Sequence, residues 1–554
     1  MKDLFKSISR SEWFFVALLC LVIMIITTLP YLIGYWRTPP GMVYTGLHAL
    51  SPGDIPVYYS YINQAKTGQY FFKDLFTSEP QNLGTFNIWW AGVGVLTRIF
   101  NWSVIFSFQL ARILMIPIFY FCAYLFISYF LVSPKQRKVC LVFLSLASGL
   151  GFYVAGADVL LNFPDTVSYR WPIDLWLTES NTFNTLYQTS HFIASIIFMM
   201  AIFLLMILAF EKSRFSYAII SGVLALVYFN FHPYYLPVIY GVLGLYLFWL
   251  IILARKILWV KVGYWLILVI VSLPSAFYHF WLIKNNPVIA QRALQNITLV
   301  SPFLFVLIGY GFLWLGLILA LYFISQNKKW NNGLVFLLLW LLFSSFLIFS
   351  PLPFQSRYTQ GLHLVLVIFT TLGLFEFYDY LKQKLSAKTF DFWVNNPALI
   401  FLLFLILFLP SNLYSVTRDL YLFLKQPLNV QDKIYLPQDV LAALTWFKDQ
   451  GSGKVILAAE IPAKFLPGFS GQTAFLAHGH ETLFFESKVE YFLWFIHDNK
   501  NDEAKKAFLK KQNIDYFFYS EYEKKMGQFD PATKDYLKLV FSLPQAEIYQ
   551  VIKN

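Results

Sequence analysis

Long apolar runs, each about the length needed to cross a lipid bilayer, recur along the first three quarters of the chain. A helix needs about 20 predominantly apolar residues to span the hydrocarbon core. The predicted spans, eleven in all, lie near residues 13–33, 103–131, 138–156, 190–210, 215–231, 234–254, 262–282, 301–324, 333–350, 359–381 and 395–414. The pattern therefore predicts an α-helical polytopic membrane protein.

The hydrophobic pattern changes after residue 416, where short apolar runs alternate with amphipathic stretches. The predicted elements are a helix at 440–450 capped by Asp439, strands at 455–459, 473–477, 514–519, 539–543 and 546–552, and helices near 485–497 and 502–511. Strands alternating with helices favour a small α/β domain with a mainly parallel sheet. We therefore expect a transmembrane domain at 1–416, a linker at 417–437 and a soluble α/β domain at 438–554.

The composition supports this division of the chain. Of the 554 residues, 58% are hydrophobic and only 13% are charged, whereas a soluble chain carries about 25% charged residues. The last 138 residues hold 17 basic and 17 acidic side chains, so the whole net charge of +12 belongs to the apolar part. This composition excludes a soluble enzyme and a disordered scaffold.

The basic residues also predict the orientation of the chain, because Lys and Arg concentrate in short cytoplasmic loops. The loops assigned to the cytoplasm, with 16 Lys and Arg, are 1–12, 132–138, 211–215, 255–261, 325–331 and 382–393. The opposite loops, with 8 in a longer total stretch, are 34–102, 157–189, 232–233, 283–300 and 351–358. We therefore expect a plasma (inner) membrane protein with a cytoplasmic N-terminus and an extracytoplasmic C-terminal domain. The excess of basic residues is an orientation signal, so no nucleic-acid partner is expected.

Two apolar segments allow more than one interpretation. Residues 84–100 are apolar enough to form a span, but counting them would invert every later loop. We favour a helix in the outer interface, with Trp89 and Trp90 at the headgroup level. The run at 13–33 is too long for a signal peptide and lacks a small-residue cleavage pattern, so it is interpreted as an uncleaved signal anchor.

The first outer loop, residues 34–102, carries the main candidate for chemistry, Asp54. This residue comes just before an amphipathic stretch at 58–68, which we expect to lie on the membrane. A carboxylate at the membrane surface can act as a general base, but an Asp at this position can equally cap the helix that follows. Asp74 and Glu79 are further acids of the loop that we expect to be solvated, with Glu79 also a candidate substrate contact.

Polar residues at the outer helix ends supply candidate ligands for a phosphate or a sugar. Arg112 lies about 13 Å below the outer end of the second span at 1.5 Å per residue, where it needs a structural partner or a lipid phosphate. His191 begins the fourth predicted span, and His232 lies at an outer turn. Each of the two histidines also fits an interfacial anchor or a helix cap.

A second group of donors lies in the motif PLPFQSRYTQGLH. The i, i+3, i+4 spacing of Arg357, Gln360 and Gly361 predicts that they share one helical face. Together with the histidines they could bind a phosphate or a sugar, although each alone also fits an anchor or a cap.

The C-terminal region contains the motif AHGHET, with His478 and His480 at a spacing that could bind zinc. No third and fourth ligands follow at metal-site spacing, so the sequence requires no cofactor, although a divalent metal is possible. GSGKV, at 451–455, lacks the spacing of a phosphate-binding loop.

The arrangement of these features resembles the GT-C superfamily of polytopic glycosyltransferases, which use polyprenyl-phosphate sugar donors. Asp54 matches the acid of that superfamily's first extracytoplasmic loop, and the run from LGTFNIWWAGVGVLTRIF to FQLARILMIP resembles its interfacial helix and second span. Phrases similar to a group of largely uncharacterised bacterial membrane proteins are NTLYQTSHF, FNFHPYY, NNPVIAQRALQNITL, PFQSRYTQGLH and GQTAFLAHGHET. One departure is that Asp54 lacks the second loop acid of many members.

The resemblance implies inverting transfer of a sugar to an acceptor hydroxyl, with Asp54 as the general base. The implied partners are a polyprenyl-phosphate-linked sugar donor, a glycan, lipid or protein acceptor, and membrane lipids. The candidate substrate-binding residues are Glu79, Arg112, His191, His232, Arg357, Gln360 and His480, the last on the acceptor side. The competing hypotheses are a membrane transporter or lipid flippase, and a non-catalytic membrane scaffold with an outer binding domain.

Overall fold

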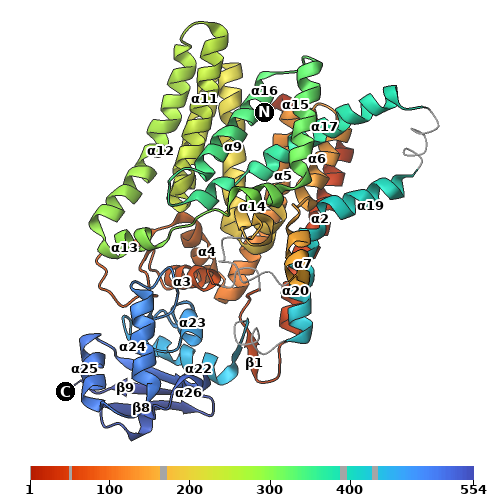
Figure 1. Ribbon diagram of the computed structural model, residues 1–554. Helices are drawn as coiled ribbons and strands as arrows, with labels where there is room; N and C mark the ends of the chain where they lie inside the picture. Colours follow the sequence, from red (N-terminus) through yellow and green to blue (C-terminus); the bar gives the residue numbers. More distant parts are fainter. Residues whose placement is uncertain (1, 49–52, 162–170, 387–395, 427–433, 554) are drawn as a thin grey trace. The chain divides into compact units, whose positions relative to one another are not determined.

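The computed structural model describes residues 2–48, 53–161, 171–386, 396–426 and 434–553 (Figure 1). Parts of the predicted linker (427–433), of the second outer loop (162–170) and of the loop at 382–393 lie outside these residues. Contacts divide the chain into two compact units. The helical unit comprises Met1–Leu29, Arg112–Tyr278 and Thr298–Arg418, and the mixed unit comprises Pro30–Ala111, His279–Ile297 and Asp419–Asn554.

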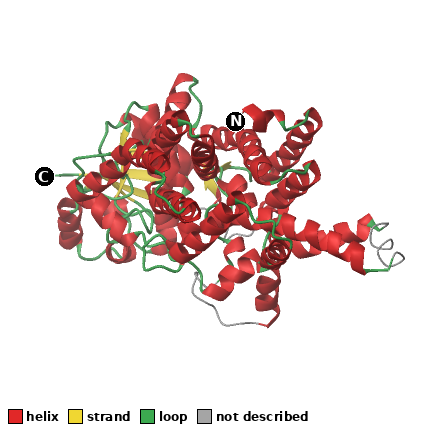
Figure 2. Cartoon of the chain, turned by 90° about the horizontal axis from the view of Figure 1, so that it is seen from above, coloured by secondary structure: helices red, strands yellow, loops and turns green. Residues whose placement is uncertain are grey.

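The helical unit is built from helices and short turns (Figure 2). Its α-helices, some of which continue into the mixed unit, are α1 (Lys2–Lys6), α2 (Arg10–Trp36), α5 (Val104–Phe130), α6 (Pro134–Leu146), α7 (Gly151–Leu161), α8 (Thr182–Gln188), α9 (Ser190–Lys212), α10 (Phe215–Phe231), α11 (Leu236–Ala254), α12 (Trp259–Asn285), α14 (Phe303–Tyr310), α15 (Phe312–Gln326), α16 (Asn332–Ile348), α17 (Leu362–Lys384), α19 (Pro397–Phe408) and α20 (Pro410–Lys425). Its 3-10 turns are η2 (Ile173–Leu175), η3 (Thr178–Ser180), η4 (Pro233–Tyr235) and η5 (Gln355–Thr359).

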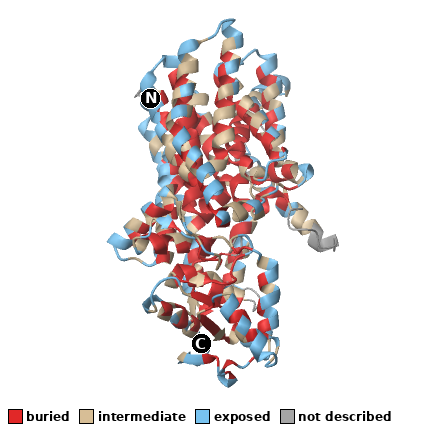
Figure 3. Cartoon of the chain, turned by 90° about the vertical axis from the view of Figure 1, so that its left-hand side faces the viewer, coloured by how far each residue is buried: buried red, intermediate tan, exposed pale blue. Residues whose placement is uncertain are grey.

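Several of these helices are long and apolar enough to cross a membrane. Seven spans among the described residues meet this condition, or eight if α14 and α15 are counted as one bent span. Many residues of these helices are exposed (Figure 3), and they include many large apolar side chains. On α12, for example, Ile270 and Phe277 are 65% and 64% exposed. Exposed apolar surface of this extent suits lipid rather than water, so the chain is an integral membrane protein.

The predicted count of eleven spans is not confirmed. Helices α10 and α16 have 17 residues each, which corresponds to about 25 Å at 1.5 Å per residue. The predicted span at 301–324 is bent by 79° between α14 and α15. Gly311 forms this bend with a φ of +49°, a conformation that favours glycine.

The mixed unit contains the first loop and the C-terminal region. Its helices are α3 (Ile55–Lys66), α4 (Ile88–Ile99), α13 (Pro287–Gln295), α22 (Gln438–Trp446), α23 (Glu460–Ser470), α24 (Phe485–His497), α25 (Asp502–Lys511) and α26 (Glu521–Met526), with 3-10 turns η6 (Phe447–Asp449) and η7 (Pro531–Thr533). Its strands are β1 (Met42–Tyr44), β2 (Phe71–Phe72), β3 (Thr85–Phe86), β4 (Tyr435–Pro437), β5 (Val455–Leu457), β6 (Thr473–Ala474), β7 (Tyr516–Ser520), β8 (Leu537–Leu543) and β9 (Ala546–Val551).

The main sheet of the mixed unit has the strand order β6-β5-β7-β9-β8. Strand β5 runs parallel to β6 and β7, whereas β9 runs antiparallel to β7 and β8. The prediction of a mainly parallel sheet is therefore wrong for half of the strand pairs. Strands β8 and β9 are joined by two residues, and a connection this short forces an antiparallel hairpin.

The hydrophobic core of the mixed unit draws on both the first loop and the C-terminal region. Buried side chains of α3 and α4, such as Tyr59 and Trp90, belong to the same cluster as Phe517 of β7 and Ile548 of β9. Nine of the twelve residues of α3 are buried, so this helix is enclosed by protein rather than spread on the membrane as we expected from the sequence.

Helix α4 is the segment that the sequence left between a span and an interfacial helix. Its 12 residues extend over about 18 Å, which is too short to cross a core of about 30 Å. A Cβ atom on Gly94 would lie 2.2 Å from the Cβ of Ala65, so glycine allows α4 to approach α3 closely. Trp90 is 1% exposed and stacks on Tyr58 with ring centroids 4.8 Å apart. Trp90 is therefore buried in protein, and its position at the headgroup level stays a prediction.

The predicted cap of the first C-terminal helix is also wrong. Helix α22 begins at Gln438, with Pro437 as its N-cap residue. Asp439 lies in the first turn, and its side chain accepts a hydrogen bond from the backbone of Gln545 at 3.1 Å.

Candidate functional site

Asp54 lies at the start of α3 in the mixed unit. A capping Asp takes an extended backbone conformation so that its side chain reaches the N–H groups of the first turn. Asp54 instead has helical angles, with φ −80° and ψ −23°, and makes no side-chain capping hydrogen bond. Its side chain is 50% exposed. The carboxylate is therefore not used as a helix cap and can be reached from solvent.

His478 lies beside this carboxylate, with Nε2 at 3.5 Å from Oδ1 of Asp54. Nδ1 of the ring accepts hydrogen bonds from the backbone N–H groups of His480 and Glu481, both at 3.2 Å. This network assigns the imidazole proton to Nε2, facing Asp54. Burial lowers the pKa of His478, but the hydrogen bond and charge of Asp54 outweigh it and raise the pKa. The ring is 6% exposed, so His478 holds Asp54 from the protein side.

Arg292 of α13 joins two further acids to this group. Its Nη1 atom lies 2.8 Å from Oε2 of Glu481 and 3.7 Å from Oδ2 of Asp74. The Asp74 side chain is 2% exposed, so the expectation that it is solvated is wrong. Burial raises the pKa of Asp74 to about 7, and the charge of Glu481 adds to this effect while Arg292 opposes it.

These contacts form one connected set, which we call the charge chain. Its members, in spatial order, are Asp54, His478, Glu481, Arg292 and Asp74. Only the Asp54 end has a side chain half open to solvent. The charge chain therefore presents one accessible carboxylate whose orientation is fixed by buried groups.

Glu79 lies in a second ion pair of the first loop. Its Oε1 atom lies 2.8 Å from Nζ of Lys488 on α24. Burial lowers the pKa of Lys488, while Glu79 raises it. The Glu79 side chain is 26% exposed, so its expected role as a substrate contact stays a prediction.

In the helical unit, Arg357 and Glu179 form an ion pair. The guanidinium also lies over the rings of Phe192 and Tyr234, at 5.6 and 5.9 Å from the ring centroids. The predicted helical face through Arg357 is wrong. Arg357 lies in η5, and α17 begins only after Gly361, whose φ is +87°.

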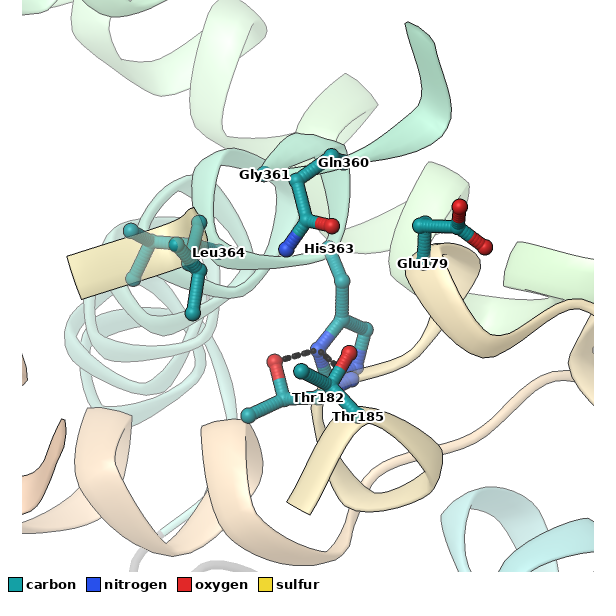
Figure 4. A pocket seen from close by; sticks show the side chains of 8 residues that line it. Glu179, Thr182, Thr185, Gln360, Gly361, His363 and Leu364 are labelled. Carbon is teal, nitrogen blue, oxygen red and sulfur yellow. Dashed lines mark hydrogen bonds between the residues drawn. The ribbon is translucent and has the colours of Figure 1, made fainter. Parts of the chain in front are cut away.

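A small pocket lies next to this ion pair (Figure 4). Its lining residues are Glu179, Thr182, Thr185, Ile196, Gln360, Gly361, His363 and Leu364. Nε2 of His363 lies 3.1 Å from the carbonyl oxygen of Ala147, which can only accept, so this nitrogen carries the ring proton. Nδ1 then accepts from the Thr182 hydroxyl at 2.9 Å. His363 is thus a neutral side chain with both nitrogens engaged.

The other predicted ligands of the helical unit lie at the ends of helices or within them. The rings of His191 and His232 are 5.0 Å apart, and His191 Nδ1 contacts the hydroxyl of Thr189. The Arg112 side chain is buried and donates to the carbonyl of Leu186 at 3.4 Å and to the hydroxyl of Thr28 at 3.3 Å. These are contacts of a structural partner, and a role in phosphate binding stays a prediction.

The structure brings together residues that the sequence did not single out. His480 is exposed, and its role as the acceptor-side contact stays a prediction. His478 is the histidine that meets Asp54. The sequence analysis did not select Arg292 or Glu179 as candidates. Both residues lie in predicted outer loops, at 283–300 and 157–189, and a charged side chain in such a loop is the signal that could have identified them. Among the described residues, no three His, Cys, Asp or Glu side chains are grouped so as to hold a metal ion.

No protein-family model matches the chain, and no curated protein matches it in sequence. Comparison with solved structures shows the fold. The fold of the chain is similar to the folds of an oligosaccharyltransferase and of ArnT, which agrees with the resemblance noted in the sequence.

Two solved structures illustrate this likeness. The oligosaccharyltransferase AglB of Archaeoglobus fulgidus, in complex with an inhibitory peptide and a dolichol-phosphate, matches with a TM-score of 0.55 and 13% identity over 92% of this chain and 70% of AglB. ArnT of Cupriavidus metallidurans, bound to undecaprenyl phosphate, matches with a TM-score of 0.52 and 11% identity over 98% of both chains.

Proposed function

We propose that the chain is a membrane glycosyltransferase that transfers a sugar from a polyprenyl-phosphate donor to an acceptor hydroxyl. The observation that carries the proposal is Asp54, a half-exposed carboxylate held by a buried histidine within a GT-C fold. Two proteins of similar fold bind dolichol-phosphate and undecaprenyl phosphate, which supports a donor of this class.

The proposed chemistry is a single displacement at the anomeric carbon. The acceptor oxygen forms a bond to that carbon while the bond to the donor phosphate oxygen breaks, and polyprenyl phosphate leaves. One oxygen of Asp54 takes the acceptor proton as the new bond forms. His478 Nε2–H holds the other oxygen, so the carboxylate keeps one orientation. Attack opposite the leaving group inverts the anomeric configuration.

The test is transfer by purified protein from a panel of undecaprenyl-phosphate sugars to candidate glycan, lipid and peptide acceptors. We expect Asp54→Asn to lower transfer by about 10²–10⁴-fold, the usual contribution of a general base. Asp449→Asn is the matched control, because Asp449 is an exposed Asp of the same unit. Transfer that survives Asp54→Asn would remove Asp54 from the mechanism, and movement of the lipid without transfer would favour a flippase.

We further propose that the reaction takes place on the extracytoplasmic face, with the N-terminus in the cytoplasm. The basis is the excess of Lys and Arg in the loops assigned to the cytoplasm. Ser452 is exposed in a turn of the C-terminal region, so Ser452→Cys provides a labelling site once Cys20, Cys122 and Cys140 are replaced by alanine. A membrane-impermeant thiol reagent should label it in intact cells. Labelling only after the membrane is opened contradicts this orientation.

A further inference from the structure

The pocket of the helical unit contains polar atoms that the fold itself does not use. Oε2 of Glu179 is buried and has no hydrogen-bond partner among the described residues. A buried carboxylate oxygen without a donor is costly, because it has lost its hydration without gaining a protein contact. The other oxygen of Glu179 is engaged by Arg357. One strong acceptor in the pocket is thus left over.

A donor lies in the same pocket. The amide oxygen of Gln360 accepts a hydrogen bond from the Tyr235 hydroxyl at 3.2 Å, which leaves the amide nitrogen to donate. Figure 4 shows the Gln360 amide projecting toward Thr182 and Thr185. Ile196 and Leu364 supply an apolar wall. The pocket thus offers one acceptor and one donor next to an apolar surface.

The charge and size of the pocket restrict its ligand. Arg357 and Glu179 neutralise each other, and a phosphate would place negative charge against the unpaired oxygen of Glu179. The pocket has room for about one water molecule, so it admits a single small group. A hydroxyl can donate to the carboxylate and accept from the amide at once, whereas an ammonium group cannot accept from the amide.

We propose that this pocket binds one hydroxyl group of a substrate sugar, with Glu179 as acceptor and Gln360 as donor. The inference rests on the proposed function for its ligand class, and it adds a specificity site within the helical unit. The hydroxyl belongs either to the sugar of the donor or to a sugar acceptor, and the chemistry of the pocket is the same in both cases. Arg357 acts as a positioning residue that orients Glu179.

The test is equilibrium binding to the full chain in lipid nanodiscs, so that it does not depend on turnover. The probes are undecaprenyl-phosphate glucose and mannose for the donor arm, and methyl glucoside and methyl mannoside for the acceptor arm, each intact and lacking one hydroxyl at a time. We expect the loss of one particular hydroxyl to weaken binding about 10-fold, because it leaves the buried carboxylate unpaired. The arm in which this occurs identifies the source of the sugar.

The variant Gln360→Leu tests the proposed donor of the pocket with the same probes. This variant should weaken binding of the intact sugar and reduce the difference between the intact and the critical deoxy probe, because only the contact with Glu179 remains. Gln383→Leu, at the exposed end of α17, should behave as the unaltered chain. Deoxy probes that all bind as well as the intact sugars, or no binding by any probe, would overturn the inference. Hydroxyl-dependent binding without any sugar transfer would uphold this pocket and reject the proposed enzymatic function.

Discussion

The charge chain of the mixed unit and the pocket of the helical unit differ in the balance and the exposure of their charged groups. The charge chain sets three carboxylates against one guanidinium and leaves Asp54 half exposed at its end. The pocket sets one carboxylate against one guanidinium, and the His363 beside it is held neutral by its hydrogen bonds. An unbalanced, accessible carboxylate suits proton transfer, whereas a balanced and enclosed set suits recognition of an uncharged group.

The largest expected effect comes from breaking the balance of the pocket. Arg357→Met should lower the free energy of unfolding by about 3 kcal/mol, because it leaves the buried carboxylate of Glu179 without its cation. The measurement is thermal or denaturant unfolding in detergent micelles. The double variant Glu179→Gln, Arg357→Met should regain at least half of the loss. If Arg357→Met alone is as stable as the unaltered chain, the ion pair between Arg357 and Glu179 does not stabilise the fold around the pocket.

The next effect tests whether the charge chain orients Asp54. His478→Ala should lower kcat by about 10–100-fold with little change in KM, because the carboxylate loses the N–H group that fixes it. His478→Gln, which retains an N–H donor, should recover part of the rate. The two substitutions His478→Ala and Asp54→Asn should not be additive. Equal rates for the alanine and glutamine variants would assign His478 a purely structural role.

A smaller effect concerns the buried end of the charge chain. The pKa of Asp74 is raised to about 7 in the folded protein, above the value of about 3.9 for an unfolded chain. Folding therefore favours the protonated acid, and its contribution is complete below about pH 4 and is lost as the pH rises through about 7. Stability should fall by on the order of 2 kcal/mol between pH 5 and pH 8.

The variant Asp74→Asn isolates this contribution. In the folded protein Oδ1 of Asp74 accepts a hydrogen bond from the backbone N–H of Phe76 at 3.0 Å. Asn has an oxygen that can accept the same hydrogen bond, but it cannot ionise. Its melting temperature should therefore vary less between pH 5 and pH 8 than that of the unaltered chain. An identical pH dependence for both proteins would show that Asp74 does not titrate in this range.

The smallest effect separates catalysis from capping at Asp54. Removal of a capping Asp costs about 1 kcal/mol, but Asp54 makes no capping hydrogen bond. Asp54→Ala should therefore change the free energy of unfolding by less than about 0.5 kcal/mol, as expected for an exposed side chain without such a role, while it abolishes transfer. A loss of about 1 kcal/mol or more would restore the capping interpretation.

Regular elements could be predicted from local sequence, whereas most partners in the site could not. The predicted helices at 485–497 and 502–511 agree with α24 and α25, because their amphipathic patterns are clear. The bend at Gly311 between α14 and α15 could not be predicted, because the apolar run continues on both sides of this glycine. The hydrophobic runs predicted the membrane class, and the fold was implied by the resemblance to a known superfamily. The number of spans depends on bends that hydropathy does not record.

The same limit applies to the candidate site. Asp54 stood out because an isolated acid precedes a helix in an outer loop. The burial of Asp74 could not be predicted, because the charged groups that surround it, Arg292 and Glu481, lie more than two hundred residues away in the sequence. Local patterns likewise could not decide between His478 and His480, because the distinction depends on how one turn meets α3.

The loop at 74–79 meets the C-terminal region across a long stretch of chain. Thr482 donates a hydrogen bond to the carbonyl of Phe76 at 2.6 Å, although the two residues are 406 positions apart. A ribosome adding 5–20 residues per second needs about 20–80 s to make that stretch. The loop at 74–79 therefore lacks these C-terminal contacts until that stretch has been made. The charge chain can form only after His478 and Glu481 have been synthesised, so products truncated before these residues would lack it.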